Sequence, residues 1–281
     1  METIKLIKKL RETTGCGMMD CKKALNKTSG NFDAAVDHLR KSGIDAAKKK
    51  SSRSAAEGLV TTKIEKNKAI IIQLNSETDF VAKNNKFINL SNKICDIAIQ
   101  EDTNLDKLLS TKIPNTENTL SDEITNQISA LGENIKLSKY QSITNENGFI
   151  ASYIHNSASE NSGKIGVLIS ININTITDEA KQLAKQIAMH IAATSPASLD
   201  ISDLPKEVIE KEKEIQKEIV TQSGKPKQII DQIVDGKMNK FYQEVVLLKQ
   251  NFVMDNKTPI SQIIDNFNEK NTSNFRISSL K

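Results

Sequence analysis

The amino-acid sequence predicts an α+β protein, because segments with two different periodicities alternate along the chain. Residues 58–64 alternate apolar and polar side chains, and residues 69–74 form an apolar run, so we expect a β-hairpin that turns at Lys66 and Asn67. A helix is predicted over residues 80–101, where apolar residues recur every three or four positions. At 281 residues, the chain is long enough for one large domain or a few small ones.

The same order of two strands and a helix returns later in the chain. Strands are predicted over residues 148–155 and 165–170, joined by a long loop over 156–163. In the helix that follows, Leu183, Ile187 and Ala188 repeat the spacing of Leu90, Ile94 and Cys95. Since neither hairpin could bury its apolar face alone, we expect a core of two related β-β-α subdomains, residues 56–144 and 145–281.

A small helical domain is expected to precede this core, over residues 1–55. Thr3 is positioned to cap its first helix, and Asn31 to cap its third, which we expect to end at residues 41–43. Residues 44–56 are predicted to be a partly helical linker. The apolar residues of the first two helices are Ile4, Ile7, Leu10, Met18, Met19, Cys21, Ala24 and Leu25.

A helical hairpin is predicted as an insertion at about residues 195–235. Residues 205–222 are rich in charge and carry Val208, Ile215 and Ile219 as a thin apolar seam. Residues 223–226 form a sharp stop, and a second helix follows with Ile229, Ile230, Ile233 and Val234. The hairpin either projects toward a partner or is a surface helix pair without one.

Composition restricts the possible function. Charged residues make up 26% of the chain and hydrophobic residues 37%, as expected for a globular protein without a membrane-spanning segment. The absence of a signal-like apolar segment and the odd number of cysteines, three, favour a reduced cytoplasmic protein. Residues 1–50 have a net charge of +6, which fits an acidic partner, a nucleic acid or an ordinary solvated face.

The sequence contains no recognisable catalytic machinery. It lacks both GxxxxGK[ST] and GxGxxG, so no phosphate-binding loop is predicted. His38, His155 and His190 stand far apart, and we place His190 away from the apolar stripe of its helix or at its edge. Neither the histidines nor the cysteines have the spacing of metal ligands. We therefore expect a protein that is not an enzyme and that uses no cofactor and no metal.

The stretch 75–83 is the strongest candidate for a functional site, because it joins a buried strand to a helix. Asp79 and Phe80 lie in this turn, whereas the corresponding turn of the second repeat, residues 172–179, has no Asp-Phe pair. The fold therefore does not require the pair, which favours a role beyond folding. The alternative is that Phe80 is a hydrophobic staple at the start of a helix.

Several motifs of this sequence, taken together and in order, resemble the elongation factor Ts family of bacterial nucleotide exchange factors for elongation factor Tu. The segments that carry the resemblance cover nearly the whole chain. They are residues 10–15, 17–25, 78–83, 132–135, 165–168, 188–193, 222–227 and 252–254.

The resemblance implies a three-helix N-terminal domain like the ubiquitin-associated domain, a core of two subdomains and an inserted helical hairpin. It also implies that Thr78, Asp79, Phe80 and Val81 reach the magnesium site of elongation factor Tu, with Phe80 as a wedge between helices of that protein. The other residues implied to contact elongation factor Tu are Arg11, Met18 and Met19 in the N-terminal domain and His155 in the second subdomain. The alternative for Met18 and Met19 is packing in the three-helix core, although we expect at least one of them to be exposed.

We therefore expect a guanine nucleotide exchange factor that binds elongation factor Tu with GDP or without nucleotide, without direct nucleic-acid binding. A dimer of heterodimers is one possible assembly. The alternative is a basic module that binds nucleic acid or the ribosome through residues 1–50. Family members commonly continue past the segment that matches residues 274–277 with a C-terminal helical module that touches elongation factor Tu. We therefore expect the contact made by this module to be missing or reduced here.

Overall fold

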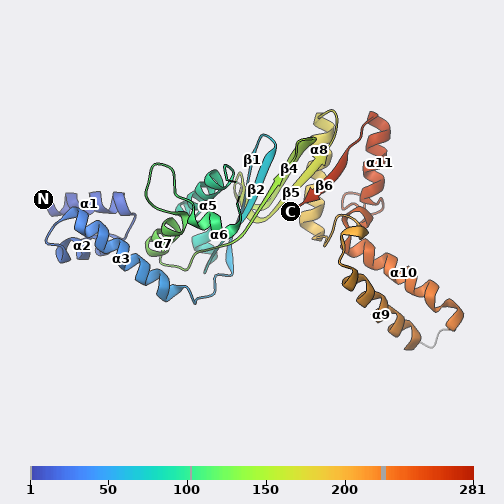
Figure 1. The fold of residues 1–281 in the computed structure, drawn as a ribbon, viewed down its shortest axis with the longest axis horizontal. Helices are drawn as coiled ribbons and strands as arrows, with labels where there is room; N and C mark the ends of the chain where they lie inside the picture. The colour runs from blue at the N-terminus through green and yellow to red at the C-terminus, as the bar shows by residue number, and fades with distance from the viewer. Residues whose placement is uncertain (1, 102, 223–225) are drawn as a thin grey trace. The chain divides into compact units, whose positions relative to one another are not determined.

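The computed structural model describes residues 2–101, 103–222 and 226–281, which fall into two compact units. Unit 1 comprises residues 1–142 together with 156–166. Unit 2 comprises residues 143–155 and 167–281. Figure 1 shows the order of the elements along the chain. The predicted α+β fold class is confirmed: a three-helix N-terminal region is followed by antiparallel strands and their covering helices.

Unit 1 begins with three helices, α1 (Glu2–Thr14), α2 (Met18–Lys27) and α3 (Phe32–Lys50). The Asn31 side chain caps α3 by accepting a hydrogen bond from the N–H of Ala34, as predicted. The prediction for Thr3 was wrong by a small margin, since α1 already begins at Glu2 and Thr3 lies inside it. The buried residues that hold the three helices together are Leu10, Cys16, Cys21, Ala24, Leu25, Ala35 and Leu39.

Helix α3 does not end at residues 41–43, where the sequence predicted its stop, but continues to Lys50. Gly43 is buried, and a Cβ atom at this position would lie 3.5 Å from the side chain of Ser129 on α7 (Leu120–Leu131). A Cβ atom at this distance would make an ordinary van der Waals contact, so Gly43 is a buried residue inside a continuing helix and not a helix terminator. Arg40 also forms an ion pair with Asp122 of α7, at 3.7 Å.

The core of unit 1 is a sheet covered by helices. Strands β1 (Glu57–Glu65) and β2 (Lys68–Ser76) form the predicted hairpin, with Leu59 opposite Leu74, and β3 (Lys136–Thr144) pairs with β2. The elements that complete unit 1 are α4 (Asp79–Ala82), α5 (Asn85–Ala98), α6 (Leu105–Ser110) and α7. The largest fully buried side chains between sheet and helices are Ile70, Ile72, Leu74, Phe87, Ile94, Leu108 and Leu120.

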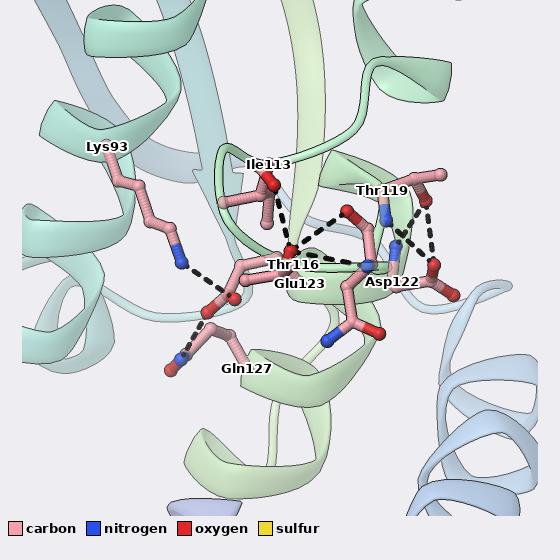
Figure 2. A network of polar contacts seen from close by, with 8 residues as sticks. Lys93, Ile113, Thr116, Thr119, Asp122, Glu123 and Gln127 are labelled. Carbon is pink, nitrogen blue, oxygen red and sulfur yellow. Dashed lines mark hydrogen bonds and ion pairs between the residues drawn. The ribbon is translucent and has the colours of Figure 1, made fainter.

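The single helix predicted over residues 80–101 is wrong, because the segment is divided into α4 and α5. The break follows from Asn84, whose side chain accepts a hydrogen bond from the N–H of Lys86 and so starts a new helix. Figure 2 shows how α5 is tied to α7: Lys93 of α5 forms an ion pair of 2.9 Å with Glu123, next to the capping box made by Thr119 and Asp122.

Three hydroxyl groups meet in the interior of unit 1. The Oγ1 atom of Thr61 on β1 lies 2.6 Å from Ser91 Oγ on α5 and 2.8 Å from Ser162 Oγ on β5 (Ser162–Asn172). All three side chains are buried. Each hydroxyl therefore has a partner away from water, which removes the cost of burying it unpaired.

Unit 2 repeats the arrangement of strands and helix. Strand β4 (Gly148–Ser159) and β5 contribute residues to both units, and β6 (Arg276–Leu280) pairs with β5. The covering helix α8 (Asp178–Thr194) is followed by η1 (Ile201–Asp203), α9 (Lys206–Gln222), α10 (Lys227–Val245), η2 (Leu247–Lys249) and α11 (Ile260–Asn271). The largest fully buried side chains of this core are Ile169, Ile171, Ile187, Leu247, Ile260 and Phe275.

The long loop predicted over residues 156–163 is wrong. Strand β4 continues to Ser159 and β5 begins at Ser162, so the connection is a tight turn between two extended strands. The sequence hides this continuation because Asn156, Ser157, Ser159 and Asn161 are turn-forming residue types. Asn156 indeed has a positive φ of 50° although it lies within the strand.

The helical hairpin is present as α9 and α10, which lie side by side (Figure 1). Its predicted seam is wrong: Val208, Ile215 and Ile219 are each more than 40% exposed. The apolar contacts come instead from Val220 of α9 and from Ile230, Val234 and Met238 of α10. The predicted stop at residues 223–226 lies mostly outside the described residues, although Pro226 directly precedes α10.

The position predicted for His190 is also wrong, because the side chain is fully buried. Its Nε2 atom lies 2.9 Å from Gln250 Oε1, and its Nδ1 atom accepts a hydrogen bond from the N–H of Val253. A buried imidazole with partners at both nitrogens is a structural element of unit 2.

Among the described residues, no helix is long and apolar enough to cross a membrane.

Candidate functional site

The turn between β2 and α4 is built around Thr78. Its backbone is extended, with φ −124° and ψ 157°, and its side-chain oxygen accepts a hydrogen bond from the N–H of Val81. Ser76 is fully buried and donates its hydroxyl to the carbonyl oxygen of Thr78 at 2.9 Å. Thr78 is thus an N-cap residue, which explains why α4 begins at Asp79.

Phe80 projects into solvent from this one-turn helix. Its side chain is 82% exposed, whereas Ala82, two residues later, is buried. The exposure excludes the hydrophobic-staple interpretation, since a staple must pack against another apolar side chain. An exposed phenylalanine presents a large apolar surface to water, and burying this surface against a partner would be favourable in free energy.

Asp79 is an exposed carboxylate with a basic neighbour on its own helix. Lys83 Nζ donates a hydrogen bond of 2.8 Å to Asp79 Oδ2. This bond, with a smaller contribution from the charge of Lys164, holds the pKa of Asp79 below its usual range. Asp79 is therefore ionised at neutral pH, and its negative charge favours interaction with a cationic group.

A carboxylate from a distant part of the chain holds Thr78 in place. Glu133 Oε2 accepts the backbone N–H of Thr78 at 3.0 Å, and Glu133 Oε1 accepts the Thr78 hydroxyl at 2.6 Å. Glu133 follows Gly132, the left-handed residue with φ 82° that ends α7. The sequence gives no sign that Glu133 belongs to the site, because nothing in the local pattern joins two positions so far apart.

The contact is reciprocated by the neighbouring residues. Glu77 Oε1 accepts the backbone N–H of Asn134 at 2.7 Å and lies 3.6 Å from the guanidinium of Arg53. Asn134 is buried and donates its side-chain amide to the carbonyl oxygen of Arg53 at 2.8 Å. We refer to Glu77, Thr78, Glu133 and Asn134 as the turn clamp.

The predicted contact residues of the N-terminal helices are on the surface. Met18 is 59% and Met19 61% exposed at the start of α2, so the alternative that either packs in the three-helix core is excluded. Arg11 is exposed in the last turn of α1. Among the described residues, no hydrogen bond or ion pair joins these three side chains to the Thr78–Val81 turn.

His155 belongs to unit 2. It is exposed on β4, and its Nδ1 atom lies 3.0 Å from the hydroxyl oxygen of Tyr153. The tyrosine fixes the orientation of the imidazole on the strand surface. The role of His155 stays a prediction.

The second repeat refines the argument from the internal comparison. Thr177 caps α8 by accepting the N–H of Ala180, and Asp178 follows it, as Asp79 follows Thr78. The cap and the aspartate are therefore common to both turns, while Glu179 takes the place of Phe80. The second turn therefore lacks the aromatic side chain, and Ala180 takes the place of Val81.

The described residues contain no group of three or more His, Cys, Asp or Glu side chains arranged to hold a metal ion. Cys95 is buried, and this burial raises the pKa of its thiol. The turn between β2 and α4 presents the apolar surface of Phe80 and the carboxylate of Asp79. An exposed aromatic beside a charged group is typical of a protein-binding site.

Comparison with known proteins identifies the family. The family model for elongation factor TS matches residues 77–279, which is most of the chain and includes the turn. The chain belongs to the elongation factor Ts family. It is similar to elongation factor Ts of Rhodospirillum centenum, with 43% identity over 263 residues that cover 93% of this chain and 85% of that protein.

Other members of the elongation factor Ts family are similar to the same extent. Elongation factor Ts of Rickettsia prowazekii is 43% identical over 274 residues, covering 97% of this chain and 88% of that protein. Elongation factor Ts of Gluconobacter oxydans is 40% identical over 263 residues, covering 94% and 87%. The resemblance inferred from the sequence motifs is thereby confirmed at the level of the family.

Proposed function

We propose that this chain is a guanine nucleotide exchange factor that acts in the cytoplasm on elongation factor Tu. It would bind elongation factor Tu with GDP, promote release of GDP, and leave a nucleotide-free complex that GTP can load. In this role the chain acts by binding and catalyses no bond chemistry of its own. The observation that carries the proposal is Phe80, an exposed aromatic on a short, well-held helix in a chain of this family.

The proposed mechanism uses the two neighbouring side chains differently. Phe80 enters between helices of the partner's nucleotide-binding domain and gains free energy by leaving water. Asp79 disturbs the groups that coordinate magnesium beside the phosphates. Magnesium neutralises phosphate charge, so a weakened magnesium site weakens the binding of GDP.

Exchange of this kind requires that the two ligands oppose each other. A coupling free energy of about 3 kcal/mol lowers nucleotide affinity by about two orders of magnitude. By reciprocity, GDP must weaken the binding of the exchange factor by the same factor. Thr78 and Val81 support the turn, while Arg11, Met18 and Met19 would give a second contact and His155 a third. The flexible thioethers suit a surface that adapts to a partner.

The test is the rate of GDP release from elongation factor Tu, followed by stopped-flow fluorescence with a labelled nucleotide. The wild-type chain is expected to accelerate release, and Phe80→Ala to reduce the accelerated rate by about tenfold or more, as for loss of a buried aromatic contact. Ile176→Ala is the matched control, since Ile176 is also an exposed apolar residue at a strand-to-helix turn. A Phe80→Ala variant as fast as wild type would contradict the wedge.

Gel filtration separates this function from the basic-module alternative. The chain and elongation factor Tu are expected to elute together without nucleotide and to separate when GDP is in excess. The eluted mass of the complex also reports whether two heterodimers associate. If instead the chain bound RNA with a steep salt dependence and did not bind elongation factor Tu, the alternative would be favoured.

A further inference from the structure

The turn clamp joins two segments that are far apart in the sequence. The carboxylate of Glu133 accepts two hydrogen bonds, one from the backbone N–H of Thr78 and one from the Thr78 hydroxyl. Glu77 accepts one from the N–H of Asn134 in the opposite direction. Each segment thus supplies a carboxylate to a backbone N–H of the other. Bonds to an ionised acceptor are the stronger class of hydrogen bond, so the two segments are held firmly together.

The clamp exceeds what helix capping requires. Thr177 caps α8 through the same kind of bond, yet among the described residues no carboxylate accepts the Thr177 hydroxyl. In the clamp, the Thr78 hydroxyl donates to Glu133 while its oxygen accepts from Val81, so one oxygen is fixed from both sides. The second repeat forms a longer helix with less support.

The length of α4 gives a reason for the extra support. The helix has four residues, and a new helix begins at Asn85, so α4 has little hydrogen bonding of its own. A single helical turn is unstable in isolation because its backbone entropy outweighs its few hydrogen bonds. The hold on Thr78 therefore adds to the buried Ala82 in keeping Phe80 and Asp79 in a fixed direction.

We propose that Glu133 is a positioning residue that holds Thr78 and thereby aims Phe80 and Asp79 at the partner. The proposal rests on the proposed function, because it assigns the two side chains their role in binding. A turn already fixed in the free protein loses less conformational entropy on docking. Glu133 does not itself need to touch the partner.

Hydrogen exchange measured by mass spectrometry tests the positioning without any partner. Glu133→Ala is expected to raise exchange in peptides that cover residues 78–83 by about tenfold, the change in opening equilibrium for loss of a charged hydrogen bond. Glu117→Ala is the matched control, since Glu117 is an exposed glutamate that forms an ion pair with Lys112. Unchanged exchange in the Glu133→Ala variant would overturn the proposal.

The kinetic test uses the maximal rate of GDP release at saturating exchange factor. Glu133→Ala is expected to lower this rate by about tenfold, equivalent to about 1.4 kcal/mol. Glu133→Gln is expected to recover most of it, because the amide oxygen accepts the Thr78 N–H and the NH₂ group can donate to the Thr78 oxygen. Failure of Glu133→Gln to recover the rate would count against positioning and favour a direct effect of the charge.

Combination with Phe80→Ala distinguishes positioning from general damage. If Glu133 acts through Phe80 and Asp79, Glu133→Ala should slow release by a smaller factor in the Phe80→Ala background than in wild type. An equal loss in both backgrounds would overturn the proposal. If Glu133→Ala does not fold, as judged by circular dichroism, Thr78→Val replaces it. This change removes both the hydroxyl bond to Glu133 and the cap bond from Val81, and it leaves the backbone bond to Glu133.

The outcomes separate the two levels of inference. A wild-type chain that fails to accelerate GDP release refutes the proposed function and the positioning role with it. Acceleration that depends on Phe80 but is unaffected by Glu133→Ala refutes the positioning role alone.

Discussion

The two strand-to-helix turns of the molecule share a framework and differ in what they present. Both begin with a threonine cap followed by an aspartate, at Thr78 and at Thr177. The first turn then places Phe80 in solvent on a four-residue helix held by Glu133, whereas the second continues directly into the seventeen-residue α8. The comparison separates the residues needed to start a helix from those added for another purpose.

The largest expected effect contrasts two phenylalanines of unit 1. Phe87 is fully buried and Phe80 is 82% exposed. Phe87→Ala should lower the free energy of unfolding by about 3–5 kcal/mol because it leaves a cavity in the core. Phe80→Ala should change it by no more than about 0.5 kcal/mol. Urea titration followed by circular dichroism measures both, and a comparable loss in the two variants would refute the division between core and binding surface.

The two threonine caps provide the next test. Thr177→Ala should cost about 1 kcal/mol of unfolding free energy through loss of the cap. Thr78→Ala should cost more, because it also leaves Glu133 without the hydroxyl that donates to it. The same urea titration compares the two variants. Equal losses would mean that the bond to Glu133 contributes nothing to stability.

The buried polar groups of the two covering helices predict different responses to acid. Helix α8 buries His190, whereas α5 buries Ser91, whose hydroxyl does not titrate in this range. Burial lowers the pKa of His190, against a smaller opposing effect of its hydrogen bond to Gln250. The folded state therefore binds this proton less readily than the unfolded chain, so stability should fall as the pH drops below about 6.5 toward the lowered pKa.

The measurement for this prediction is the urea midpoint at about pH 7.5 and about pH 5.5, on either side of the ordinary histidine pKa. Wild type should lose more stability between these conditions than His190→Gln, which has no imidazole to protonate. If the two proteins lost the same amount, the acid sensitivity would have to come from other groups.

The smallest effect is expected from the ion pairs beside the caps. Asp79 pairs with Lys83 and Asp178 with Lys181, and all four side chains are solvent-exposed. Exposed pairs contribute little because water and salt screen them. Lys83→Ala and Lys181→Ala should therefore both leave the urea midpoint unchanged within error. A clear loss in Lys83→Ala alone would show that its bond to Asp79 helps to hold α4.

Much of the fold could be predicted from the sequence because it depends on local periodicity. The hairpin of β1 and β2 and the apolar faces of α5 and α8 follow from patterns within a few residues. The turn at Phe80 was singled out by comparison with the distant second repeat, and the sequence left a hydrophobic staple as the alternative. The end of α3 was missed because Gly43, a residue type that often follows the end of a helix, here lies buried within it.

Two further errors have the same origin. In α9, the buried contact with α10 is made by Val220, with Ile209 half-buried beside it, whereas the more regularly spaced Val208, Ile215 and Ile219 are exposed. In the site, Glu133 could not be found because its partner Thr78 is distant in sequence and only the folded sheet brings them together. Contacts of this kind leave no local signal.

The three buried hydroxyls of Thr61, Ser91 and Ser162 limit how the chain can be divided. Unit 1 receives Ser162 from residues 156–166, after the chain has already passed through unit 2. A truncated protein that ends at residue 142 would thus lack one of the three hydroxyls and a strand that lies beside β1. Recombinant fragments cut at a single point should be less stable than the intact chain. A separately added peptide spanning 156–166 should restore stability to the fragment that ends at residue 142.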